Sequence, residues 1–152
     1  MSMTARQISI IQSSFAKVEP IADQAAEIFY DKLFEYDPSL RSLFESNMKD
    51  QGQKLMTVLK VAVGSLNDLE GLVPTLQNLA KAHIKYGIEA EDYTPVGNAL
   101  IYALQQGLGP AFTPELRKAW TDLYRLVATV MRQAAYPGFN PRTFKNKRHY
   151  NR

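Results

Sequence analysis

The chain has 152 residues, 45% of them apolar and 22% charged, which is the size and composition expected of one globular domain with a sizeable core. It contains no cysteine, which excludes disulfides, thiolate metal sites and a cysteine nucleophile. No apolar run is long enough to span a membrane, and no basic segment followed by an apolar run opens the chain. We therefore expect a cytoplasmic protein without a transmembrane segment or signal peptide.

The net charge of +3 is unevenly distributed. Residues 140–152 hold five basic residues and no acid, which leaves 13 basic and 15 acidic residues in the rest of the chain. We accordingly expect a domain at 1–138 and a basic, disordered tail at 139–152. A solvated chain end accounts for this tail, and we do not expect it to bind nucleic acid. Contact with nucleic acid or an anionic membrane is the alternative.

Apolar residues recur at helical spacing through nearly the whole chain, and no alternation at period two predicts a strand. The first predicted helix covers residues 4–18, with Thr4 as its N-cap. Pro20 suits the first turn of a second helix, which ends near Asp37. Pro38 then opens a short helical turn.

The middle of the chain predicts two further helices. Asp50 could cap the first of them, after an irregular polar segment at 45–50. In the second, Leu76, Leu79 and His83 share one helical face, since they are three and four residues apart. Gly71 and Pro74 precede this helix, and Gly87 would end it. A histidine in that place is either a core residue bonded to a backbone carbonyl or a ligand for a metal or cofactor.

Two predicted helices complete the domain. The first covers residues 92–108. The segment Thr113-Pro114-Glu115 is a strong helix start, with a capping threonine, a proline at the first position and an acid in the first turn. The last helix begins there and runs to about Tyr136. Six or seven helices, one very short, give an all-α fold.

Three local patterns occur in order along these helices. Phe29-Tyr30 precedes Leu33-Phe34, Pro38 precedes Leu43-Phe44, and the apolar face ending in His83 precedes Gly87-Ile88. Together with Ala119-Trp120-Thr121-Asp122-Leu123-Tyr124 in the last helix, they resemble a globin over roughly residues 5–135. In detail they are similar to the bacterial single-domain globins, namely the globin domain of flavohaemoglobins and Vitreoscilla-type haemoglobin. The resemblance implies a globin fold around one haem b (iron protoporphyrin IX).

On the proximal side, the resemblance makes His83 the axial ligand of the haem iron and places Tyr93 beside it. It places Phe44 on the haem face. The other residues that we expect to contact the haem are apolar: Leu55, Val58, Leu79, Ile88 and Val96. In the flavohaemoglobin branch a glutamate of the last helix pairs with the tyrosine and the histidine. The equivalent residue here is Ala135, so that carboxylate is missing.

On the distal side, the resemblance assigns Tyr30, Gln51 and Leu55 to the gas-binding pocket. Tyr30 and Gln51 can donate hydrogen bonds to dioxygen, which becomes a good acceptor when it binds iron. The alternatives are that Tyr30 is a core residue with a backbone partner and that Gln51 faces solvent.

We therefore expect a globin that reversibly binds dioxygen, and also NO and CO, as a carrier, store or scavenger. The alternative is a nitric oxide dioxygenase that relies on an external reductase, since no reductase domain follows residue 140. A haem-free signalling module is a third possibility, which His83 disfavours. We expect a monomer or weak dimer and assign no catalytic residue.

Overall fold

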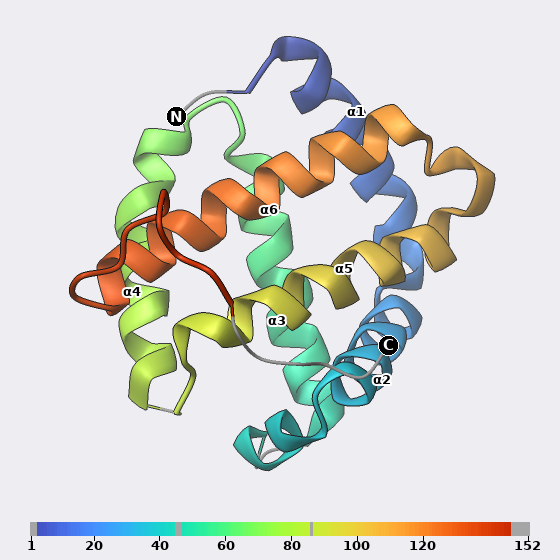
Figure 1. Cartoon of the computed structure of the whole chain (residues 1–152). Coiled ribbons are helices and arrows are strands. Elements are labelled where there is room, and N and C mark those ends of the chain that lie inside the picture. Colours follow the sequence, from blue (N-terminus) through green and yellow to red (C-terminus); the bar gives the residue numbers. More distant parts are fainter. Residues whose placement is uncertain (1–2, 45–46, 86, 147–152) are drawn as a thin grey trace.

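The computed structural model describes residues 3–44, 47–85 and 87–146, and all regular secondary structure in these ranges is helical (Figure 1). This confirms the predicted all-α fold with six to seven helices. The described elements are, in chain order, α1 (Ala5–Val18), η1 (Glu19–Ile21), α2 (Ala22–Tyr36), η2 (Pro38–Leu43), α3 (Met48–Gly64), α4 (Leu69–Lys85), η3 (Ala90–Asp92), α5 (Tyr93–Leu108), η4 (Gly109–Ala111) and α6 (Pro114–Ala135), where η denotes a 3₁₀-helix.

Local capping sets two of the helix starts that the sequence predicts. Thr4 Oγ1 accepts a hydrogen bond from the Gln7 N–H at 3.0 Å, and Gln7 Oε1 accepts from the Thr4 N–H at 3.1 Å, which forms a capping box before α1. Thr113 Oγ1 accepts from the Leu116 N–H at 3.2 Å, and Pro114 is the first residue of α6. Both predicted helix starts are confirmed. Each depends on a cap and a partner within four residues of each other, so the sequence alone is enough to identify it.

The predicted starts of α3 and α4 are wrong. Asn47, rather than Asp50, caps α3, with its Oδ1 accepting from the Lys49 N–H at 2.7 Å. Helix α4 begins at Leu69, so Pro74 lies inside it, exposed to solvent. A proline there removes one backbone donor, and the resulting loss of a single hydrogen bond near the start of a helix is tolerated when packing holds the rest.

The helices pack in pairs, and the helices that carry the predicted distal residues belong to different pairs from the helix that carries His83. Helix α2 packs against α5 and α3, and α1 packs against α6, α3 and α5. Helix α4 packs against α6, which runs alongside α5 across the molecule (Figure 1). Trp120 of α6 is 1% exposed, and its Nε1–H donates to Ser14 Oγ of α1 at 2.9 Å. Helix α3, which carries Gln51, and helix α4, which carries His83, therefore have different principal packing partners.

After α6 the chain turns back on itself. The Phe144 N–H donates to the Asn140 carbonyl at 2.9 Å, and the rings of Phe139 and Phe144 lie 5.2 Å apart. Asn146 Nδ2 donates to the Glu91 carbonyl of η3 at 3.0 Å. Residues 139–146 thus lie against the domain, whereas composition alone favours an unstructured chain from residue 139. Residues 147–152 lie outside the described part, and disorder there stays a prediction.

A bilayer crossing needs a helix that is both long and strongly apolar. Among the residues that the structure describes, no helix meets both requirements.

Candidate functional site

His83 lies in the last two turns of α4, on the face that also carries buried Leu76 and half-buried Leu79. Its Nδ1 is enclosed and has no hydrogen-bond partner among the described residues. Burial lowers the pKa of the imidazole. The neutral imidazole is therefore favoured at neutral pH, and this is the form of histidine that binds metal ions.

The backbone after His83 forms a Schellman cap, in which two N–H groups beyond the helix donate back to its last carbonyls. The Ile88 N–H donates to the His83 carbonyl at 3.1 Å, and the Gly87 N–H donates to the Ile84 carbonyl at 3.0 Å. Gly87 has a φ of +86°, which favours glycine. The cap fixes Ile88, one of the predicted haem contacts, next to the backbone of His83.

Tyr93 opens α5 beside the histidine. Its ring centroid lies 6.4 Å from that of His83, and the two ring planes are inclined by 74°. The Tyr93 hydroxyl is enclosed and has no partner within the described ranges. Burial is the largest of the causes that raise its pKa, so the hydroxyl stays protonated. The structure therefore brings Tyr93 and His83 together.

Tyr124 of α6 holds the backbone of Tyr93 in place. Its hydroxyl donates to the Tyr93 carbonyl at 2.6 Å. Gly97 makes this possible, because a Cβ at that position would lie only 2.5 Å from Tyr124 Cε2. The conspicuous Trp120 and Tyr124 of the sequence are thus packing residues, and Tyr124 acts on the site through the backbone.

Tyr30 of α2, the predicted distal tyrosine, is 8% exposed, and its hydroxyl donates to the Gln51 carbonyl of α3 at 3.3 Å. The two helices meet closely here, because a Cβ at Gly52 would lie 3.0 Å from the Cβ of Ala26. The bond is longer than the usual 2.7–2.8 Å for two oxygens, so it is weak. Burial raises the pKa of Tyr30 to about 12, so the hydroxyl remains a donor at neutral pH.

Two phenylalanines surround Tyr30. Its ring lies 5.4 Å from Phe44, the predicted haem contact, and 6.0 Å from Phe34. The rings of Phe34 and Phe44 are 5.5 Å apart. Phe34 was not predicted as a site residue, although it is four residues after Tyr30 and therefore on the same helical face.

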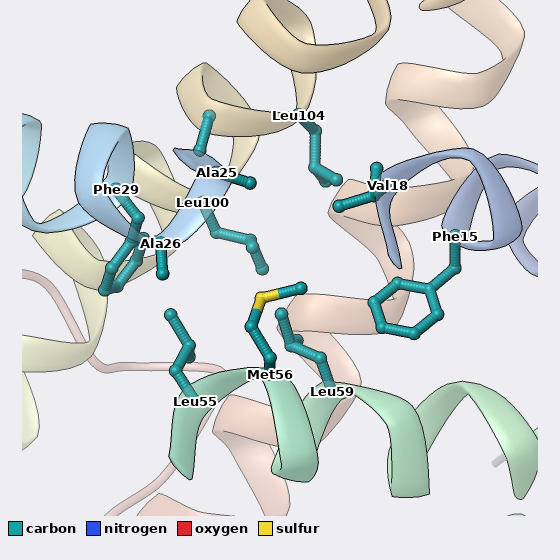
Figure 2. Close-up of a pocket in the computed structure, with 11 residues that line it drawn as sticks. Phe15, Val18, Ala25, Ala26, Phe29, Leu55, Met56, Leu59, Leu100 and Leu104 are labelled. Atoms are coloured by element: carbon teal, nitrogen blue, oxygen red, sulfur yellow. The ribbon is translucent and has the colours of Figure 1, made fainter. Parts of the chain in front are cut away.

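Leu55 of α3 points into a small cavity of about 20 Å³ in the core (Figure 2). The cavity has room for about one water-sized molecule, and its lining is apolar: Phe15, Val18, Ala25, Ala26, Phe29, Leu55, Met56, Leu59, Leu100, Ala103 and Leu104. Leu79, Ile88 and Val96 are half-buried at the edge of the core. Val58 is 37% exposed. Val58 is not among the residues that line this cavity.

The family model for globins matches residues 27–131, so the chain belongs to the globin family. Neuroglobin of Danio rerio is 36% identical over 118 residues, which cover 68% of this chain and 74% of the relative. Neuroglobin-2 of Oncorhynchus mykiss is 30% identical over 143 residues, covering 85% and 90%.

A solved structure has the same fold. It is an engineered carbene transferase from Rhodothermus marinus, with a TM-score of 0.79 and 24% identity, covering 88% of this chain and 94% of the other. Membership of the globin family implies a haem-type cofactor. The residues present fit such a group. His83 supplies a neutral imidazole, and the apolar residues that we expect to contact the haem are only partly covered by protein: Leu55, Val58, Leu79, Ile88 and Val96. The bacterial branch of the family stays a prediction.

Proposed function

We propose that this globin binds haem b through His83 and reversibly binds dioxygen, with NO and CO as further ligands. The observation that carries the proposal is the enclosed, neutral imidazole of His83 on α4, without a partner for Nδ1 among the described residues. Since Nδ1 is enclosed, Nε2 is the nitrogen that would bind the iron. When bound, the haem supplies the iron to which a diatomic gas attaches.

The chain's own residues would then divide the work. Phe44, Leu55, Val58, Leu79, Ile88, Tyr93 and Val96 would surround the porphyrin and exclude water. Tyr30 would donate a hydrogen bond to the gas, and Gln51 would be the second donor. A donor to a charged acceptor contributes about 1.5–3 kcal/mol, enough for roughly a ten- to hundredfold gain in affinity.

The test is the absorption spectrum of the purified protein, oxidised, reduced and reduced under CO, together with a pyridine haemochrome to identify haem b. We expect a Soret band that shifts on reduction and on CO binding. His83→Ala should lose stable haem or hold it with an altered spectrum, and His149→Ala is the matched control. An unchanged reduced spectrum in His83→Ala would refute the assignment, and a wild-type protein without a Soret band would favour the haem-free alternative.

A second candidate activity is nitric oxide dioxygenation, in which NO, dioxygen and one electron give nitrate. An external reductase would supply that electron. Two observations favour this activity. The chain has two donor side chains, Tyr30 and Gln51, and the Rhodothermus marinus protein of the same fold is named as a candidate nitric oxide dioxygenase. Multiple-turnover NO consumption, with and without a reductase and NADH, distinguishes the two functions. Sustained turnover with the reductase would support the enzyme, and a single stoichiometric burst would support oxygen binding alone.

A further inference from the structure

Arg132 of α6 lies at the centre of a group of contacts around Tyr93. Its Nε–H donates to the Ala90 carbonyl at 2.9 Å, and its Nη2–H donates to Thr94 Oγ1 at 3.2 Å. The guanidinium lies 5.4 Å from the centroid of the Tyr93 ring. One side chain therefore joins the last helix to Ala90, three residues before Tyr93, and to Thr94, directly after it.

The segment 139–146 covers this arginine. The guanidinium lies 4.6 Å from the ring centroid of Phe144 and 5.8 Å from that of Phe139. Arginine favours such stacked positions because its planar cation is attracted to aromatic faces and is only weakly hydrated. Asn146 fastens the end of the segment to η3 through the Glu91 carbonyl.

Tyr136 reinforces the same region. Its hydroxyl donates to the Ile88 carbonyl at 2.6 Å, and its ring lies 6.5 Å from that of Tyr93. The residues from 88 to 94, which follow His83 in the chain, are thus held by polar groups of α6 and of the segment after it. Ala135, where the resembling branch has a carboxylate, is buried and apolar.

We propose that Arg132 is the positioning residue of the proximal site: it holds Tyr93 against His83, and the segment 139–146 keeps the arginine there. The inference rests on the proposed haem binding through His83. Tyr93 makes no hydrogen bond through its hydroxyl to the described residues, so its position depends on ring packing and on its backbone. Residues that orient a metal-binding histidine commonly change metal affinity by about ten- to a hundredfold.

The experiment compares Arg132→Met with Arg132→Lys in the full-length holoprotein. Arg125→Met is the matched control, since Arg125 is an exposed arginine two turns earlier on the same helix. Two quantities are measured: the rate of haem transfer to an excess of apomyoglobin, and the iron–histidine stretching band of the ferrous protein by resonance Raman. We expect Arg132→Met to lose haem about tenfold faster and to shift or broaden the band. Arg132→Lys should restore part of both, and Arg125→Met should change neither.

A double variant separates positioning from general stability. Tyr93→Leu alone should alter the band, and adding Arg132→Met should then produce little further change, because the arginine acts through the tyrosine. Phe144→Ala provides a milder perturbation of the same contact and should give a smaller shift in the same direction. An Arg132→Met protein with a lower unfolding temperature but a wild-type band would overturn the proposal.

The outcomes also separate this inference from the proposed function. If the wild-type protein holds haem and His83→Ala abolishes it, silent Arg132 variants overturn the inference alone. If His83→Ala leaves the reduced spectrum unchanged, the proposed ligand is wrong and the inference is overturned with it.

Discussion

The hydroxyl of Tyr30 donates to the backbone carbonyl of Gln51 across 3.3 Å, which ties the middle of α2 to the first turn of α3. The acceptor is the backbone carbonyl of Gln51, so this bond does not involve the amide side chain of Gln51. The length of the bond shows that it is weak. A ligand with a partial negative charge would offer the hydroxyl a stronger acceptor.

Tyr30→Phe keeps the ring, which packs against Phe44, and removes only the hydroxyl. If the hydroxyl reaches the gas, oxygen dissociation should become roughly ten- to a hundredfold faster, since a bond of about 1.5–3 kcal/mol is lost. CO dissociation should change far less, because bound CO carries less negative charge. Stopped-flow displacement measures both rates. An unchanged oxygen off-rate would show that Tyr30 is a packing residue.

Gln51→Leu and the double variant complete that experiment. If Gln51→Leu alone accelerates oxygen release, the glutamine is the donor and Tyr30 is not. A double variant that exceeds the sum of the single effects would mean that each donor substitutes for the other.

The ferrous protein should be five-coordinate before gas is added. His83 is one of two histidines in the sequence, and the other is His149. We therefore expect CO to bind in a single phase, without a slow step in which an internal histidine is released. Ferrous absorption spectra and CO flash photolysis provide the measurement. A six-coordinate low-spin ferrous spectrum that persists in His149→Ala would contradict this and would point to Tyr30 or Gln51 as a ligand.

Tyr124→Phe should destabilise the protein by about 0.5–1.5 kcal/mol, because the Tyr93 carbonyl loses its 2.6 Å hydrogen bond in a partly buried position. Gly97→Ala should act at the same place by forcing the Tyr124 ring away, at a cost of about 1–3 kcal/mol. Urea unfolding measures both, with Tyr102→Phe on α5 as the control. If the two variants prove additive when combined, they do not act through the shared contact.

Stability should decrease in alkali. Burial raises the pKa of Tyr30 in the folded state to about 12, whereas the unfolded chain has a value near 10. The folded state therefore keeps a proton that the unfolded state releases, so stability falls as the pH rises from about 10 toward 12. The loss from Tyr30 should be about 1–2 kcal/mol. Urea unfolding at several pH values tests it, and Tyr30→Phe should show a shallower decline than the wild type.

Signals close together in sequence predicted most of the fold. The caps Thr4 and Thr113 are predictable because the oxygen of an N-cap side chain accepts from an N–H only three residues away. Asp50 and Pro74 give the wrong helix starts. Asn47 caps α3 in place of Asp50, and α4 begins at Leu69, before Pro74, where its first turns pack in the core. Helix type and order were thus predictable, and two helix boundaries were not.

The site shows the same division. The pairing of His83 with Tyr93 followed from a resemblance, and the structure brings the two rings together. Nothing in the spacing indicates that Arg132 would reach Ala90 and Thr94, which are 42 and 38 residues away. Contacts of this kind depend on how α6 packs beside α5 and η3, and a single sequence contains no local pattern for that packing.

The return of residues 139–146 onto η3 also bears on how this protein is labelled or fused. A fluorophore or affinity tag attached shortly after Asn146 would begin its path beside Glu91, a few residues from Tyr93. Such a tag would start next to η3, the element that leads into Tyr93. An electron donor tethered at the same point would likewise start beside η3.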